Sequence, residues 1–269
     1  MNKKLGQNFL INGNLRKKIA EAVLTGNPKY IWEIGGGIGA LSSEFLDSSI
    51  KLDIFEIDKG FITILEELYK DKPHIQVIKG DVRETWPKIW QQNGTPDRIV
   101  GNLPYNIGAK IITGLIKREC IPHRAVFTIQ KEVAGRLMAK PGEKSYSFLS
   151  VVCSLYWDMR IISHLKPGSF YPRPEVTSTA VKCDKKSKFP QFNDKNFFYS
   201  FLNNMFISRR KTIKRNLTTY YKESIKPSHS IDAILKALDI NPSARIEELT
   251  PKTILELSNN LHSAITTCL

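Results

Sequence analysis

Four consecutive residues, Asn102-Leu103-Pro104-Tyr105, carry the groups needed to hold a planar amino group. The side-chain carbonyl of Asn102 and the backbone carbonyl of Leu103 can accept its two N–H bonds, and the Tyr105 ring can stack on the attached base. Pro104 stiffens the loop and keeps the Leu103 carbonyl directed at the site. Such binding shifts the nitrogen toward sp³ character, which prepares it to receive a methyl group by positioning alone. The alternative is an ordinary turn after a strand.

A glycine-rich segment, Gly35-Gly36-Gly37-Ile38-Gly39, follows an apolar run and precedes a stretch with helical character. Glycines let the backbone turn tightly and approach a ligand closely. The segment also fits the G-x-G-x-x-A pattern of dinucleotide sites through Gly35, Gly37 and Ala40. It therefore predicts a nucleotide-containing ligand, and a purely structural turn is the alternative.

Three acidic residues help to choose between ligands. Glu33 lies just before the glycines, where the cationic end of a ligand is favoured and a pyrophosphate is not. Glu56 ends the second apolar run, 21 residues after Gly35, and can accept hydrogen bonds from both ribose hydroxyls. Asp81 ends the third run and can accept from an adenine amino group. This pattern resembles the S-adenosyl-L-methionine sites of Rossmann-like methyltransferases, so we expect that cofactor; solvated acids beside a structural turn are the alternative.

The glycines and acids follow the ends of short apolar runs that alternate with helical patterns. We expect strands at Tyr30–Ile34, Leu52–Ile57, Ile75–Ile78, Arg98–Val100 and Ala125–Ile129. This alternation is typical of an α/β fold with a parallel sheet, whose carboxyl ends meet at one edge. Two later runs, Leu149–Tyr156 and Thr177–Cys183, have no evident long helix between them and predict antiparallel strands at one side of the sheet.

A composition break at 184–188 predicts a linker. Beyond it the pattern is helical, over Phe197–Tyr220, Ser230–Leu238 and Thr250–His262. Within the first of these, one helical face is formed by Leu202, Phe206, Ile213 and Leu217. We therefore expect a Rossmann-like domain over residues 1–184 and a small all-helical C-terminal domain over residues 185–269.

The chain carries 40 Lys and Arg against 26 Asp and Glu, a net charge of +14. Residues 182–226 hold twelve of the basic and three of the acidic residues, so more than half of the surplus lies in one sixth of the chain. Such asymmetry indicates a polyanion partner, with a lysine-rich surface as the alternative. The densest basic run predicts a helix that binds an RNA backbone, with a solvated helix face as the alternative. Its expected RNA-binding residues are Arg209, Arg210, Lys211, Lys214 and Arg215, of which Arg210 with Lys214 and Lys211 with Arg215 form two charged ridges. Lys131, Arg136 and Lys140 could extend this surface.

Four segments that occur in order resemble one enzyme family: Gly6-Gln7-Asn8-Phe9-Leu10, the glycine loop, Asn102-Leu103-Pro104-Tyr105, and Phe170-Tyr171-Pro172-Arg173-Pro174-Glu175-Val176. The chain is similar over essentially its whole length to the small-subunit ribosomal RNA adenine N6,N6-dimethyltransferases, the bacterial kasugamycin-resistance methyltransferases. The third segment fits the [D/N/S]-[P/L/I]-P-[Y/F/W] motif of enzymes that methylate planar nitrogens.

The resemblance implies a function and a set of site residues. It implies two methyl transfers to each of two adjacent adenosines in the 3′-terminal hairpin of small-subunit rRNA within a pre-ribosomal 30S particle, with a role in small-subunit biogenesis. It places Phe170 opposite Tyr105 as a second aromatic wall, against which the flipped base is clamped. Cofactor contacts are implied for Asn8, Leu10, Gly35, Gly37, Glu56, Asp81 and Asn102. The family usually has proline where this chain has Gly36, which could change cofactor affinity.

Other functions fit the sequence less well. The nearest alternative is a large-subunit rRNA adenine methyltransferase that confers macrolide resistance; the helical tail, the basic run and the Phe170–Val176 segment favour the small subunit. A DNA adenine methyltransferase is disfavoured because no separate DNA-recognition domain is evident. A non-catalytic RNA-binding or ribosome-assembly factor on the same fold is disfavoured by the intact motifs.

Several classes of protein are not expected from the composition. No apolar stretch is long enough for a transmembrane helix, and the beginning of the chain lacks the apolar region of a secretory signal. The five histidines show no metal-ligand spacing. The cysteines, Cys120, Cys153, Cys183 and Cys268, form no C-x-x-C pair, which favours a reducing compartment. We expect a cytoplasmic, metal-free monomer with no membrane partner.

Overall fold

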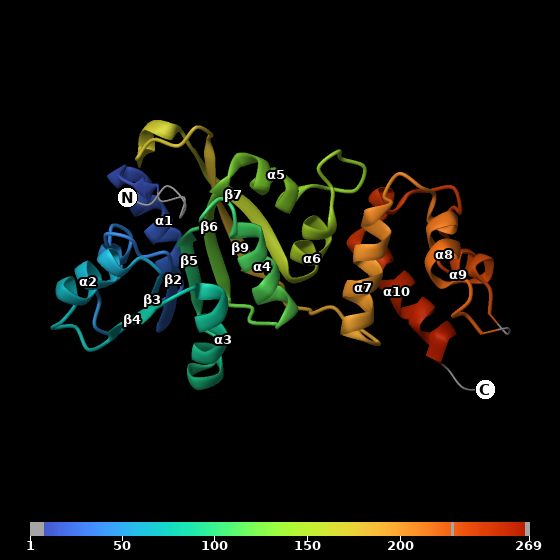
Figure 1. Cartoon of the computed structure of the whole chain (residues 1–269), viewed down its shortest axis with the longest axis horizontal. Helices are drawn as coiled ribbons and strands as arrows, with labels where there is room; N and C mark the ends of the chain where they lie inside the picture. The colour runs from blue at the N-terminus through green and yellow to red at the C-terminus, as the bar shows by residue number, and fades with distance from the viewer. Residues whose placement is uncertain (1–7, 227–228, 267–269) are drawn as a thin grey trace. The chain divides into compact units, whose positions relative to one another are not determined.

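The computed structural model describes residues 8–226 and 229–266. Its main sheet has seven strands in the order β4-β3-β2-β5-β6-β9-β7 (Figure 1). The five strands from β4 to β6 run parallel, and β9 runs antiparallel to both β6 and β7. The strands are β2 (Tyr30–Ile34), β3 (Lys51–Glu56), β4 (Ile75–Lys79), β5 (Arg98–Asn102), β6 (Arg124–Gln130), β7 (Trp157–Leu165) and β9 (Ser178–Lys185). The expected α/β class with a Rossmann-like parallel sheet is confirmed.

Helices cover the parallel part of the sheet. Residues 52–56 of β3 are all buried, as expected for a central strand with both faces covered. The covering helices are α1 (Gly13–Leu24), α2 (Lys59–Leu68), α3 (Val82–Asn93) and α4 (Gly108–Lys117). The starts of α2 and α3 follow from polar caps, because Asp58 accepts from the Gly60 and Phe61 N–H groups of α2 and Asp81 from the Arg83 N–H of α3. Asp58 and Asp81, which follow the ends of β3 and β4, therefore lie at the starts of helices along the carboxyl edge of the sheet.

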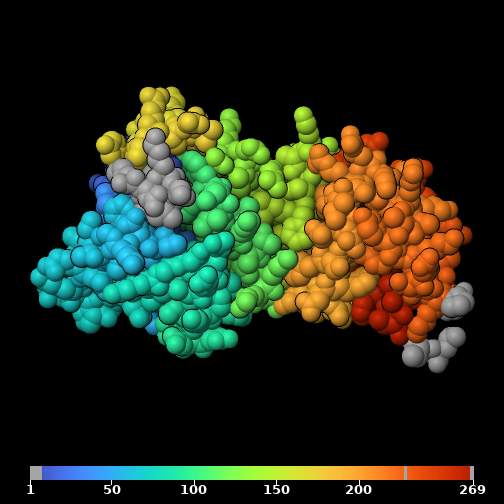
Figure 2. Space-filling model, viewed as in Figure 1, coloured from blue at the N-terminus to red at the C-terminus, as the bar shows by residue number. Residues whose placement is uncertain are grey.

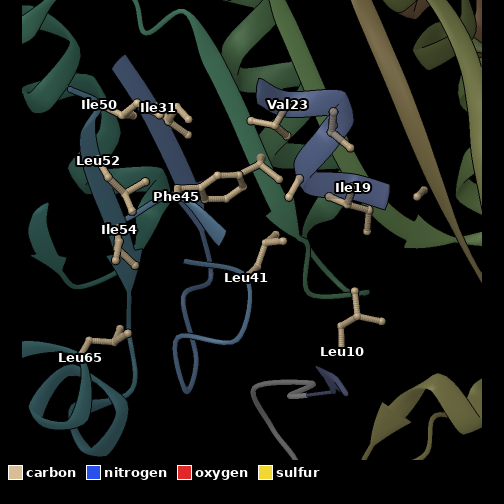
Figure 3. Packing of buried hydrophobic residues seen from close by; sticks show 14 of the residues in the cluster. Leu10, Ile19, Val23, Ile31, Leu41, Phe45, Ile50, Leu52, Ile54 and Leu65 are labelled. Atoms are coloured by element: carbon tan, nitrogen blue, oxygen red, sulfur yellow. The ribbon is translucent and has the colours of Figure 1, made fainter. Parts of the chain in front are cut away.

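One face of the sheet packs on α1. Aliphatic side chains of β2 and β3, among them Ile31 and Leu52, meet Ile19 and Val23 of α1 around Phe45 (Figure 3). The carboxyl end of α1 is held by two arginines of the sheet. Arg98 donates to the carbonyls of Val23 and Thr25, at 3.0 and 2.8 Å, and Arg124 donates to Ala22 at 2.8 Å. Cations at this end also complement the helix dipole, so α1 is fixed to the sheet.

A short second sheet involves the beginning of the described chain. Strand β1 (Phe9–Leu10) pairs antiparallel with β8 (Phe170–Tyr171), so that Phe9 lies opposite Tyr171 and Leu10 opposite Phe170. The backbone N–H of Ile11 extends the contact by donating to the Ser169 carbonyl at 2.9 Å. This pairing joins the beginning of the described chain to the segment that directly precedes β9.

The prediction of a strand at Leu149–Tyr156 is wrong. Phe148–Tyr156 forms helix α6, and the strand begins at Trp157 instead. Five consecutive residues of α6, from Leu149 to Cys153, are all buried, so the apolar run shows no helical period. A helix that is apolar on all sides cannot be distinguished from a buried strand by periodicity.

The chain forms two compact units, residues 1–134 with 157–185 and residues 135–156 with 186–269. The second unit differs from the expected helical domain because it includes Gly135–Tyr156. In the space-filling view this yellow-green segment lies against the orange residues of the first C-terminal helix (Figure 2). The C-terminal helices are α7 (Lys195–Ile207), α8 (Ile213–Tyr221), α9 (Ile231–Ala237) and α10 (Pro251–Thr266).

The expected helix over Phe197–Tyr220 is interrupted. Helix α7 ends at Ile207, and α8 begins after Thr212, whose hydroxyl accepts from the Arg215 N–H. Leu202, Ile213 and Leu217 are buried as expected, but on two helices rather than on one face. Residues 208–212 form a turn between them.

Candidate functional site

A pocket lies at the carboxyl ends of β2, β3 and β5. Strand β2 is flanked by β3 on one side and β5 on the other, so the chain order reverses there. Open α/β sheets bind ligands at such a point. The glycine loop, Glu56, Asp81 and Asn102–Tyr105 all line this one pocket, together with Asn8.

The glycine loop leaves β2 through left-handed backbone conformations. Gly35, Gly37 and Gly39 have φ values of 80°, 54° and 78°, which residues with side chains rarely adopt. The Gly35 N–H donates to the Phe55 carbonyl at 2.9 Å, which ties the loop to the end of β3. The helix expected after the glycines is wrong; turns lead to a 3₁₀ segment at Ser42–Glu44.

Glu56 holds the loop with its own carboxylate. One oxygen accepts from the Gly37 N–H at 2.8 Å, and the other accepts from the N–H groups of Ile57 and Asp58, each at 2.8 Å. A carboxylate offers about four acceptor positions, so three are filled by the backbone. The acceptor position that is left lies on the oxygen that binds Gly37, and the expected contact with both ribose hydroxyls stays a prediction.

Asp81 lines the pocket but is engaged by Arg83. The Arg83 backbone N–H donates to Asp81 at 2.8 Å, and its guanidinium donates to both carboxylate oxygens. The side-chain hydrogen bond from Arg83 lowers the pKa of Asp81. The carboxylate is thus ionised and fixed, and an adenine amino group would share it with Arg83.

Glu33 does not reach the pocket. Its carboxyl is buried below the loop, where the Ser42 hydroxyl donates to it at 2.5 Å. Burial raises the pKa of Glu33 to about 8, and the nearby Glu56 charge acts in the same direction. The sequence argument that Glu33 attracts a cationic ligand is therefore wrong, because the group is neutral at pH 7 and does not line the site.

The reaction loop is held at both of its ends. The Asn102 side-chain NH₂ donates to the Asn8 carbonyl at 2.5 Å, and the Leu103 N–H donates to the Thr128 carbonyl at 3.0 Å. The Tyr105 hydroxyl lies 2.7 Å from that of Ser178, and burial raises the pKa of Tyr105. The Asn102 side chain and the Tyr105 ring are thus each held in place by a hydrogen bond. Both residues line the pocket, at the strand edge that the sequence predicts for them.

Two aromatic residues of the pocket were not expected from the sequence. Phe9 and Phe61 line it and meet edge to face, with ring centroids 5.0 Å apart. A Cβ at Gly37 would lie 2.7 Å from the Phe9 ring, so the glycine makes room for that ring. A sequence motif identifies Phe9, but only the fold shows that it covers the glycine loop.

The structure separates Leu10 and Phe170 from the pocket. Both are buried in the core cluster, with 5% and 3% exposure, and neither lines the site. The pocket lining therefore includes neither the Leu10 side chain nor the Phe170 ring, and the expected cofactor contact of Leu10 and the expected stacking role of Phe170 opposite Tyr105 stay predictions. The neighbouring Tyr171 is 61% exposed. Gly6 and Gln7 of the same motif lie outside the described residues, as does Cys268.

The basic run does not form the two expected helical ridges, because its residues are divided between a turn and α8. Arg209 is used internally: it donates to the Lys144 carbonyl at 3.0 Å and pairs with Glu247 at 3.5 Å. Lys214 pairs with Asp232 at 2.7 Å. Arg210, Lys211 and Arg215 are exposed, and the last lies with Lys214 in a shallow groove beside Thr218 and Ser243.

Lys131, Arg136 and Lys140 are also exposed, the first in the sheet-containing unit and the others in the helical unit. Within residues 8–226 and 229–266, no cluster of His, Cys, Asp and Glu could hold a metal ion. In the same residues, no helix is both long enough and apolar enough to cross a membrane.

Known proteins resemble this chain over nearly its full length. Residues 1–263 match the family model described as ribosomal RNA adenine dimethylase. A Treponema denticola protein named ribosomal RNA small subunit methyltransferase A is 34% identical, covering 96% of this chain and 89% of that protein. The protein of the same name from Halothermothrix orenii is 36% identical, covering 97% and 88%.

Solved structures agree with the fold. A dimethyladenosine transferase from Plasmodium falciparum is 25% identical and superposes with a TM-score of 0.79, covering 93% of this chain and 95% of that one. The 23S rRNA methyltransferase ErmE is 21% identical, with a TM-score of 0.69 over 95% and 100% of the two chains. At that identity the second match supports the fold alone.

Proposed function

The chain belongs to the ribosomal RNA adenine dimethylase family, and from that premise we propose that it transfers methyl groups from S-adenosyl-L-methionine to N6 of two adjacent adenosines in the 3′-terminal hairpin of small-subunit rRNA. The observation that carries the proposal is one pocket lined by the glycine loop, Glu56 and the Asn102–Tyr105 loop. The small-subunit assignment is supported by relatives of that name at 34–36% identity. We place the reaction on a pre-ribosomal 30S particle in the cytoplasm. We expect the activity to make cells sensitive to kasugamycin, and we expect the active form to be a monomer.

The pocket suits a nucleoside-containing methyl donor. Phe9, Phe61 and Ile57 provide apolar walls, while the Glu56 oxygen facing the loop retains an acceptor position for a ribose hydroxyl. Asp81 supplies a second ionised acceptor at the α3 start. S-adenosyl-L-methionine, when bound, supplies a methyl group on a positively charged sulfur.

The protein's contribution to the reaction is positioning. The Asn102 oxygen and the Leu103 carbonyl accept the two N–H bonds of the target amino group, which draws its lone pair out of the ring and toward the methyl donor. Tyr105, held through Ser178, stacks on the base. Because an adenine must leave its helix to reach the pocket, a single-stranded or loop substrate is favoured. After transfer, the nitrogen releases its proton to solvent.

The proposal is tested by methylating ribosomal particles that lack this modification. Small subunits and, separately, large subunits from cells without the dimethylase are incubated with the protein and labelled S-adenosyl-L-methionine, and the digested rRNA is analysed by mass spectrometry. We expect N6,N6-dimethyladenosine at two adjacent positions, and no product with Asn102→Ala. Label in large subunits but not in small subunits would assign the chain to the other branch of rRNA methyltransferases. Absence of label in both would refute the activity.

A further inference from the structure

Resting on the proposed function, we propose that the N-terminal strand β1 is a positioning element of the reaction site. Asn8, the residue directly before the strand, supplies the carbonyl that holds the Asn102 amide in the one orientation that directs its oxygen at the substrate. The strand that precedes the whole sheet in sequence thereby sets the geometry of a loop 94 residues later. This role uses the backbone of Asn8, so its side chain gives no signal for it.

The orientation follows from the chemistry of the two groups. A side-chain amide has an NH₂ end that donates and an oxygen that accepts. The Asn8 carbonyl can only accept, so only the NH₂ end of Asn102 can bind it. The oxygen must then point the other way, and an adenine amino group needs an acceptor there. A flipped Asn102 amide would direct its NH₂ group at the amino group of the adenine. Two groups that only donate hydrogen bonds would then face each other, and the substrate would be repelled.

Strand β1 is anchored independently of the pocket. Its pairing with β8 is extended at Ile11, which donates to Ser169 at 2.9 Å. Leu10 and Phe170 face the core cluster and are almost completely buried. Asn12 then caps α1 by accepting from Leu15 at 3.1 Å, so the chain directly after the strand is also fixed. Phe170 therefore contributes to the site by holding β1.

Leu10→Ala tests this by loosening β1 without touching the pocket lining. Leu52→Ala is the matched control, because it removes the same side chain from the same cluster at the far end of β3 from Glu56. The first readout is exchange of the Asn102 side-chain NH₂ protons by NMR, assigned by their disappearance in Asn102→Asp. Loss of one hydrogen bond speeds exchange by about fivefold, which we expect in Leu10→Ala and not in Leu52→Ala. Equal exchange in both variants overturns the proposal, whether or not the protein methylates rRNA.

The second readout is the single-turnover rate at saturating cofactor and RNA. Leu10→Ala should lower it by about three- to tenfold. In the Asn102→Asp background the same change should have little effect, because a carboxylate presents an oxygen in either orientation. If the role of Leu10 is merely structural, Leu10→Ala should lower the single-turnover rate by the same factor in both backgrounds. That result would refute the inference. An inactive wild-type protein would instead refute the proposed function and leave the exchange result to decide the positioning role.

Discussion

Glu33→Gln replaces a buried ionisable group by a neutral one of nearly the same shape. Glu33 is 2% exposed, and the Ser42 hydroxyl that donates to it can equally donate to an amide oxygen. Burial raises the pKa of Glu33 from 4.5 to about 8, so the native carboxyl is protonated at pH 7 while the unfolded one is ionised. We expect the substitution to increase the stability of the sheet-containing unit at neutral and alkaline pH.

The magnitude follows from proton linkage. Between about pH 4.5 and 8, the native state holds one proton that the unfolded state has lost. The stability contributed by this group is complete below pH 4.5 and falls by about 1.4 kcal/mol per pH unit as the pH rises through that window. The total is on the order of 5 kcal/mol by pH 8, as an upper limit. The free energy of unfolding of the variant minus that of wild type should therefore increase as the pH rises.

Urea unfolding at pH 5, 6.5 and 8 measures this slope. All four tryptophans lie in the sheet-containing unit, so intrinsic fluorescence reports on that unit. Subtracting wild type from Glu33→Gln cancels the opposite contributions of carboxylates with lowered pKa, such as Asp81 and Asp184. Glu21→Gln, at an exposed position of α1, is the control for replacing a carboxyl group by an amide. A pH-independent difference for Glu33→Gln would show that Glu33 is ionised in the native state.

Three further predictions concern the pocket and the basic surface. Gly36→Ala places a Cβ 2.3 Å from the Ile54 Cγ2 atom and should cost about 1–3 kcal/mol of stability; thermal unfolding should show less than additive loss when it is combined with Ile54→Ala. Glu56→Ala frees three backbone N–H groups, so calorimetry should show cofactor affinity reduced by at least tenfold, whereas unchanged affinity in a folded variant would contradict the site. Replacing both Arg210 and Lys211 by Ala should flatten the salt dependence of RNA binding by about one to two units without changing cofactor affinity, whereas Arg209→Ala should mainly destabilise the helical unit.

The ends of the parallel strands could be predicted because glycines and acids directly follow apolar runs. Gly35, Glu56, Asp81 and Asn102 therefore meet at one edge, as the alternation of strands and helices indicates. The position of a residue relative to that edge was harder to predict. Glu33 is one residue before the strand end, and its side chain points into the protein below the loop, which the spacing alone does not show.

Features that depend on distant partners could not be predicted. Phe148–Tyr156 is a largely buried helix, and its apolar run carries no helical period that would distinguish it from a buried strand. The basic run is divided because the Thr212 hydroxyl starts a new helix there and Arg209 turns inward to Glu247. Gly36 departs from the proline usual in the family, and the structure supplies the reason: Ile54 and Leu65 occupy the space that any larger residue would need.

The pairing of β1 with β8 also determines when the protein becomes competent during its synthesis. Leu10 leaves the ribosome early, but its partner Phe170 is 160 residues later in the chain. At the usual rates of translation, the delay is on the order of ten seconds. In the later part of that interval the nascent chain already contains the glycine loop and Asn102, yet β8, the strand that pairs with β1, has not been made. Catalytic competence thus arrives only with the completed sheet-containing unit, and truncated chains that end before Tyr171 would be inactive even where their parallel strands have formed.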